Sequence, residues 1–225
     1  MKIGLVYTGT TPELVERVER EVRQQLGEDV ELLTYQNADI LALAREAGQV
    51  TPRSAALLME LVAQALKDGA NAILNNCSSV GEVADSLQNF ARHIGVPLVR
   101  IDEEMCYEAV RRGGTIAVMA TLPTTLEPTR NTLLRAAREL GRQIKLVDVY
   151  VENAFGLSPA LFKQRMVESA LAGAKSVDVI LFAQGSMAYC EDEVAQATGI
   201  PVLSSPAWGA KALREALIKR GELKL

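Results

Sequence analysis

The sequence has one histidine, three cysteines and few aromatic residues, and each shortage removes a class of function. A Ser-His-Asp triad would have to use His93, and a zinc site with two or more histidine ligands is excluded. Aromatic residues make up 4% of the chain, which leaves little material for stacking nucleic-acid bases. The net charge of −4 offers no basic surface to a phosphate backbone, so we expect no nucleic-acid partner.

Long apolar runs are also lacking. No run approaches the roughly 18 residues of a membrane-spanning helix, and the first apolar segment is too short for a secretory signal. Cys77, Cys106 and Cys190 are odd in number and widely spaced, which does not fit a disulfide framework. We therefore expect a cytoplasmic protein with reduced thiols and no membrane partner. The glycine patterns of dinucleotide-binding and Walker A loops are absent, so we expect no nucleotide cofactor.

What the chain does contain is a regular alternation of short apolar runs and longer amphipathic segments. The runs are rich in Val and Ile and mostly continuous, which is typical of parallel strands buried on both faces. Predicted strands cover residues 3–7, 30–33, 72–74, 97–101, 115–119, 145–151, 177–183 and 201–203. Predicted helices cover residues 12–26, 52–67, 82–94, 102–112, 127–140, 159–172, 191–198 and 208–220. This alternation predicts an α/β fold.

The sequence also repeats itself. Residues 3–8 align with residues 116–121, and residues 73–79 align with residues 180–186. We therefore predict two pseudo-symmetric lobes, each a roughly four-stranded parallel sheet flanked by helices, with an active site in the cleft between the lobes. Lobe one is predicted to span residues 1–100 plus 206–225, and lobe two residues 101–205.

Ligands of open parallel sheets bind beyond the carboxyl ends of the strands, so the segments there are the candidate site. They are small, uncharged and rich in hydroxyl and amide groups, and with backbone N–H groups before a helix they suit a small carboxylate. The candidate substrate-binding residues are Thr8, Thr10, Asn76, Ser78, Ser79, Thr121, Thr124, Thr125, Gln184, Gly185 and Ser186.

Cys77 is the strongest candidate for chemistry. It follows a predicted buried strand and precedes a predicted helix, and a helix start lowers the pKa of a thiol. The alternative is a small thiol packed in the core. Asn75, Asn76, Ser78 and Ser79 surround it in sequence, and this polar setting favours a reactive role.

Two α/β lobes, a Cys-Ser-Ser tip at residues 77–79 and a Thr-x-x-Thr tip at residues 121–124 together resemble the aspartate/glutamate/hydantoin racemase superfamily. The resemblance implies an isomerase that needs neither pyridoxal phosphate nor a metal, and a homodimer. In its racemases, a cysteine thiolate on one lobe takes the α-proton and a thiol on the other lobe returns one to the opposite face. It implies Cys77 as acid/base, and Thr121, Thr124 and Thr125 as ligands of the substrate carboxylate.

The sequence departs from this family at one position. The repeat aligns Cys77 with Gln184, where the second catalytic cysteine would stand. Gln184 can donate hydrogen bonds, for example to an enolate-like oxygen, but cannot exchange protons usefully. Cys190 follows shortly after. Either the intervening loop returns it to the cleft as a second catalytic residue, or it points into the core.

Three functions therefore stay open. The first is a racemase or epimerase-like enzyme that transfers a proton at the carbon α to the carboxylate of a small amino acid or related acid. The second is a single-cysteine decarboxylase or lyase acting on a malonate-like acid. The third is a two-lobed protein that binds a small acid without catalysis.

Overall fold

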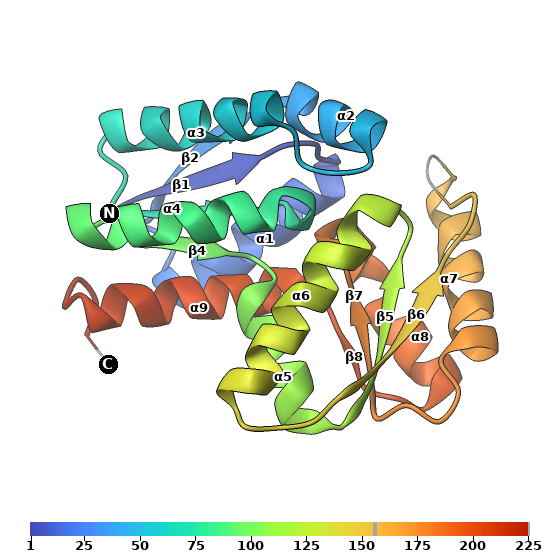
Figure 1. Cartoon of the computed structure of the whole chain (residues 1–225). Coiled ribbons are helices and arrows are strands. Elements are labelled where there is room, and N and C mark those ends of the chain that lie inside the picture. The colour runs from blue at the N-terminus through green and yellow to red at the C-terminus, as the bar shows by residue number, and fades with distance from the viewer. Residues whose placement is uncertain (155–156, 225) are drawn as a thin grey trace. The chain divides into compact units, whose positions relative to one another are not determined.

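The computed structural model describes residues 1–154 and 157–224, and the chain divides into two compact units (Figure 1). Unit 1 comprises Met1–Glu103 and Pro206–Leu225, and unit 2 comprises Glu104–Ser205. Phe155, Gly156 and Leu225 fall within the predicted lobes but lie outside the described residues. In the described part of the chain, no helix has the length and apolar character needed to cross a membrane.

Each unit contains one four-stranded parallel sheet. In unit 1 the strand order is β2-β1-β3-β4, and in unit 2 it is β6-β5-β7-β8. The strands of unit 1 are β1 (Lys2–Tyr7), β2 (Glu31–Gln36), β3 (Ala72–Asn75) and β4 (Leu98–Arg100). Those of unit 2 are β5 (Thr115–Ala120), β6 (Lys145–Tyr150), β7 (Val179–Phe182) and β8 (Val202–Leu203). The predicted α/β fold with two parallel sheets is confirmed.

Helices flank both sheets (Figure 1). Those of the first half are α1 (Pro12–Leu26), α2 (Ala38–Ala47), α3 (Pro52–Lys67), the 3₁₀ turn η1 (Ser78–Val80) and α4 (Gly81–Ile94). Those of the second half are α5 (Glu103–Arg112), α6 (Pro123–Glu139), α7 (Pro159–Gly173), the 3₁₀ segment η2 (Gly185–Cys190), α8 (Glu191–Thr198) and α9 (Ser205–Lys219). Helices α1, α3 and α8 have the predicted bounds. Helix α2 has no counterpart among the predicted helices, and α6 begins four residues before the predicted start at residue 127.

Side-chain caps explain where two of these helices begin. The Thr11 hydroxyl accepts the Leu14 N–H at 3.3 Å at the start of α1. At the start of α3, the Thr51 hydroxyl accepts the Ser54 N–H at 3.0 Å and the Ser54 hydroxyl accepts the Thr51 N–H at 2.9 Å. Such a cap stabilises a helix by about 1 kcal/mol, and the following proline has the backbone angle that the first turn requires. Ser158 precedes Pro159 at the start of α7, but its side chain makes no capping bond.

The sheet of unit 1 is buried on both faces. One face packs Ile3 and Leu5 against α1 and α9. The other packs Val6 and Ile73 against α2, α3 and α4. Because both faces are covered, most positions of the central strands β1 and β3 are apolar, which explains the continuous runs in the sequence.

The two units share their internal register. Ile3 lies opposite Ala72 in unit 1, and Ile116 lies opposite Val179 in unit 2. The start of each first strand is also held alike. In unit 1 the Asn71 side chain accepts the Lys2 N–H at 2.8 Å, and in unit 2 the aligned Asp178 accepts the N–H groups of Gly114 and Thr115, each at 2.8 Å. The repeat in the sequence is therefore a repeat in structure.

Candidate active site

The carboxyl ends of the two central strands bring the predicted residues of unit 1 together. Strands β1 and β3 are neighbours, and the Asn76 N–H extends their ladder by donating to the Val6 carbonyl at 2.8 Å. Thr8 directly follows β1 and Cys77 is the second residue after β3, and the Thr8 hydroxyl lies against the Cys77 sulfur. Thr10 lies further along the chain, half-buried, with its hydroxyl donating to the Thr11 carbonyl at 3.1 Å. Thr8, Asn76 and Cys77 thus form the centre of the unit 1 site.

The Cys77 thiol is half-buried, and its surroundings act in opposite directions. Burial raises the pKa of Cys77, and the charge of Asp102 raises it further. The Thr8 hydroxyl and the backbone N–H groups of Val80 and Ser79 favour the thiolate, but burial prevails. The donors at the helix start do lower the pKa of this thiol, but desolvation outweighs them, so the expectation of a net lowered pKa is wrong. Cys77 is a neutral thiol at neutral pH that has thiolate-stabilising donors in place.

Two polar atoms near this thiol are buried without a hydrogen-bond partner among the described residues. They are Asn75 Oδ1 and Asn76 Oδ1. The Asn75 amide nitrogen donates to the Cys77 carbonyl at 3.0 Å and that of Asn76 to the Leu74 carbonyl at 3.1 Å, which leaves both amide oxygens as acceptors. An unsatisfied buried polar group costs about 1–3 kcal/mol, so this concentration is typical of a site that a polar ligand completes.

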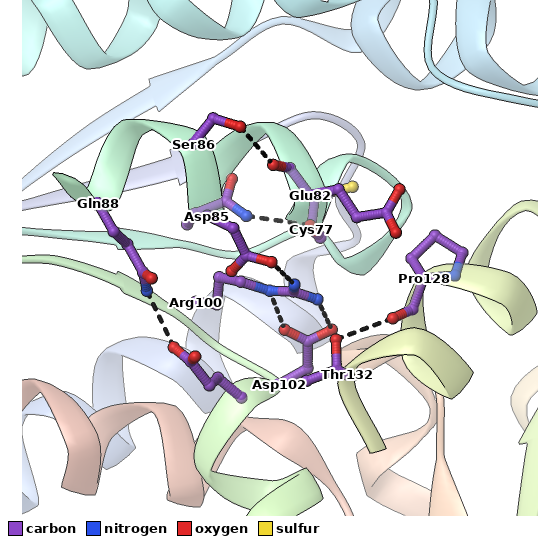
Figure 2. A network of polar contacts seen from close by, with 11 residues as sticks. Cys77, Glu82, Asp85, Ser86, Gln88, Arg100, Asp102, Pro128 and Thr132 are labelled. Atoms are coloured by element: carbon purple, nitrogen blue, oxygen red, sulfur yellow. Dashed lines mark hydrogen bonds and ion pairs between the residues drawn. The ribbon is translucent and has the colours of Figure 1, made fainter. Parts of the chain in front are cut away.

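A buried ionic network lies near the Cys77 thiol, and Figure 2 shows it from close by. Arg100 is fully buried at the end of β4. Its Nε and Nη2 donate to Asp102 Oδ1 and Oδ2 at 3.0 and 2.9 Å, and its Nη1 donates to Asp85 Oδ2 at 2.7 Å. The guanidinium group holds the pKa of Asp102 below its usual range, although burial opposes this. Sequence reasoning missed these residues; the only signal was an arginine at the end of an apolar run.

In unit 2 the Gln184 side-chain amide links the carboxyl ends of strands β5 and β7 by hydrogen bonds. The Gln184 Oε1 accepts the N–H groups of Thr121 and Leu122 at 2.7 and 3.2 Å, and the Thr121 hydroxyl at 3.2 Å. The Gln184 Nε2 donates to Thr121 Oγ1 at 2.8 Å. These three donors surround one oxygen at the start of α6, as they would surround a carboxylate oxygen. The Gln184 amide oxygen therefore accepts from donors that the sequence led us to expect around a substrate carboxylate.

The remaining predicted residues of unit 2 lie nearby along the chain. Thr124 and Thr125 are buried in the first turn of α6, and the Thr125 hydroxyl donates to the Leu122 carbonyl at 2.8 Å. Gly185 and Ser186 are half-buried at the start of η2. The early start of α6 places the threonines on a helix and not in the expected loop.

Cys190 lies in the hydrophobic core of unit 2. Its side chain is fully buried, in one cluster with Phe182, Met187 and Val194. Burial and the charge of Glu193 raise the pKa of Cys190 to about 12. The expectation of a second catalytic thiol at Cys190 does not agree with this packing, since the sulfur is inside the core, and the alternative of a core residue describes it.

Cys77 and Gln184 occupy equivalent positions. Each is the second residue after its strand and directly precedes a 3₁₀ segment, and their backbone angles are similar, with φ and ψ of −142° and 116° for Cys77 and −135° and 131° for Gln184. Each also contacts the threonine that follows the first strand of its unit, Thr8 or Thr121. Among the described residues, no group of three or more His, Cys, Asp or Glu side chains is arranged to hold a metal ion.

The sequence and the structure of the chain were compared with those of known proteins. A family model described as Asp/Glu/Hydantoin racemase matches residues 3–213. No curated protein sequence matches the chain significantly.

Solved structures resemble the chain over nearly its whole length. Glutamate racemase RacE1 from Bacillus anthracis has a TM-score of 0.73 at 17% identity, covering 97% of this chain and 82% of that one. Allantoin racemase from Klebsiella pneumoniae has a TM-score of 0.66 at 17% identity, covering 98% and 89%. An arylmalonate decarboxylase has a TM-score of 0.59 at 14% identity, covering 96% and 92%. At these identities the likeness is one of fold.

Proposed function

Because the chain belongs to the Asp/Glu/hydantoin racemase family, we propose that it transfers a proton, without a cofactor, at the carbon α to a carboxylate. Cys77 is the acid/base group of this reaction. Thr8, Asn76, Ser78 and Ser79, all in unit 1, bind the substrate. The substrate is a small acid. The segments at the carboxyl ends of the strands, residues 8–11, 75–79, 121–125 and 184–187, carry no charged side chain, which is in keeping with this.

The observation that carries this proposal is the difference between Cys77 and Gln184 at equivalent positions. Cys77 is half-buried, has donors for its thiolate form and adjoins polar atoms that lack partners. The Gln184 amide cannot act as an acid or base near neutral pH, and its oxygen already accepts hydrogen bonds from Thr121 and Leu122. The two cysteines of unit 2, Cys106 and Cys190, are both fully buried, so Cys77 is the thiol that we assign to the reaction. Proton transfer by a protein group is therefore expected on one face of the α-carbon only.

A reaction with one protonation fits this arrangement best, as in decarboxylation of a malonate-like acid. The bond between the α-carbon and one carboxylate breaks, carbon dioxide leaves, and the electron pair remains on the α-carbon, delocalised into the second carboxylate. The neutral Cys77 thiol then donates its proton to that carbon, and the Ser79 and Val80 N–H groups stabilise the resulting thiolate. Solvent returns the proton to the sulfur.

Racemisation or epimerisation is the second candidate, and family membership favours it. Here the Cys77 thiolate removes the α-proton and a solvent molecule must supply a proton to the opposite face. The raised pKa of Cys77 makes the thiolate scarce at neutral pH, so this reaction would accelerate with rising pH.

Incubation in deuterated water with a panel of malonates, amino acids and ureides tests both candidates. Release of carbon dioxide with deuterium on one face of the product supports decarboxylation, and exchange with inversion supports racemisation. Both activities must disappear in Cys77→Ala. If no acid in the panel is converted but ligands still raise the melting temperature of the protein, the chain binds a small acid without catalysis and the proposal fails.

A further inference from the structure

The buried network of Arg100, Asp85 and Asp102 is unusual for a chain whose other strand-end residues are uncharged. We propose that Asp102, held by Arg100, is a positioning residue for the Cys77 thiol and acts through the Ser78 hydroxyl. The proposal rests on the acid/base role of Cys77 given above. It assigns the network a function beyond holding β4 in place.

The first step of the argument is that Asp102 cannot move. Both of its oxygens accept from one guanidinium group, at 3.0 and 2.9 Å, and its side chain is 1% exposed. Arg100 is fixed in turn, since its side chain is fully buried and a second carboxylate, Asp85, holds its Nη1 at 2.7 Å. Figure 2 shows the two carboxylates on either side of the guanidinium group. A bidentate pair of this kind fixes orientation as well as distance.

The second step links Asp102 to the thiol. The Ser78 hydroxyl donates to the Asp102 carboxylate. Ser78 is the first residue of η1, directly after Cys77. The next two residues, Ser79 and Val80, provide the N–H groups that favour the Cys77 thiolate. Anchoring Ser78 therefore holds both N–H groups toward the sulfur.

The third step is the close packing of the network against the same turn. Gly81 follows η1, and a β-carbon built on it would lie 2.3 Å from Arg100 Nη2 and 2.5 Å from Arg100 Cζ. The start of α4 thus rests directly on the guanidinium group, and only glycine permits this approach. The network therefore contacts η1 at two places: Asp102 binds the Ser78 side chain, and Arg100 packs against the backbone at Gly81.

Asp102 is also the charged group whose field reaches the thiol and opposes ionisation. Helices α2 and α4 pack against η1, so their charges are the others to consider. The charged side chains of these helices are Asp39, Arg45, Glu46, Glu82, Asp85 and Arg92, all of them exposed except Asp85, which is half-buried. Removing Asp102 would therefore change charge and geometry at once, whereas removing the Ser78 hydroxyl changes geometry alone.

The test compares Ser78→Ala, Ser78→Thr and Ser86→Ala by the rate of iodoacetamide labelling at Cys77 between pH 6 and pH 11, read by mass spectrometry of the folded protein. Ser86 is the matched control, because its hydroxyl donates to the Glu82 carbonyl at 3.2 Å on the exposed side of α4. We expect Ser78→Ala to raise the midpoint of the pH profile by about one unit, which slows labelling about tenfold below the midpoint. Ser78→Thr restores the profile, and Ser86→Ala leaves it unchanged.

A change of access to the sulfur would alter the plateau rate at high pH and leave the midpoint in place, so the profile separates the two effects. The proposal is overturned if Ser78→Ala has the wild-type midpoint, or if Ser78→Thr shifts it as much as Ser78→Ala does. Labelling needs no substrate. A shifted midpoint in a protein without turnover would thus reject the proposed function and leave the positioning role of Asp102 intact.

Discussion

The carboxyl ends of the two sheets have the same architecture and opposite chemistry. In unit 1, Cys77 follows β3 and has donors that stabilise its thiolate. In unit 2, the equivalent position after β7 is Gln184, whose amide oxygen accepts the N–H of Thr121 in the loop after β5. The strands, their order and their register are repeated, so the difference arises from single side chains. Duplication of a scaffold therefore does not duplicate its chemistry.

The contrast extends to the outermost strand of each sheet. Leu98 lies opposite Ile73 and Val202 lies opposite Ile180, so Arg100 in unit 1 corresponds to Ser204 in unit 2. Arg100 anchors two carboxylates in a buried network, whereas the Ser204 hydroxyl donates to the half-buried Glu191. At the corresponding place, unit 1 has a buried charge network beside its thiol and unit 2 has a hydrogen bond from a serine to a carboxylate.

The largest difference is expected between replacing Cys77 in unit 1 and replacing Cys190 in unit 2. Cys77→Ala is expected to lower turnover by about 10²–10⁴-fold, the usual contribution of a general acid or base. Cys190→Ala should leave the turnover per folded molecule unchanged, because its sulfur is packed in the core. Steady-state kinetics on the substrate identified in the deuterium experiment measure both. Equal losses in the two variants would contradict a one-sided mechanism.

Replacing the corresponding residues of the outermost strands should affect stability unequally. Arg100→Met leaves Asp102 buried without its partner and is expected to lower the free energy of unfolding by about 3–5 kcal/mol. Ser204→Ala removes one hydrogen bond of a half-buried pair and should cost about 1 kcal/mol. Urea denaturation followed by circular dichroism gives both values. Similar costs would mean that the network of unit 1 is not a structural anchor.

Gln184→Ala tests the hydrogen bonds that the Gln184 amide makes at the strand ends of unit 2. It leaves the N–H groups of Thr121 and Leu122 without their acceptor, and we expect a loss of about 1–3 kcal/mol in the free energy of unfolding. Added carboxylates should recover part of this loss by occupying the vacated position, measured as a rise in melting temperature. A melting temperature that carboxylates raise equally in the wild type and the variant would show that Gln184 does not occupy an anion-binding position.

The smallest expected effect is a pH dependence of stability that comes from Asp102. Its pKa is lowered in the folded chain, so its contribution is fully present above the unfolded value of about 3.9 and is lost as the pH falls through the folded value. The difference in free energy of unfolding between the wild type and Asp102→Asn should therefore be constant above about pH 5 and shrink below about pH 4. A difference that widens on acidification would contradict the sign of this pKa shift.

Much of the fold can be predicted from the sequence because burial on both faces of a parallel sheet imposes continuous apolar runs. The strands, the repeat and the helices with threonine and proline at their starts follow from such local patterns. Helix α2 is short and mostly exposed, so it carries little of that pattern. The start of α6 is obscured by Pro123, by Pro128 within the helix and by threonines that read as a loop.

The site is less predictable because it depends on contacts between distant segments. The position of Cys77 after a buried strand was informative, and so was the absence of a thiol at position 184. The direction of the Cys77 pKa was not, since desolvation depends on packing that brings residues 8, 77 and 102 together. The partnership of Arg100 with Asp85 and Asp102 depends likewise on the seating of α4 against β4.

Thiol reactivity in the native protein tests the central claim most directly, because it asks which sulfur is available for chemistry. Iodoacetamide labelling of the folded chain across a range of pH should modify Cys77 alone, with a midpoint above the ordinary thiol value of about 8.5, while Cys190 reacts only after unfolding. Labelling of Cys190 at a rate equal to or above that of Cys77 would contradict the account.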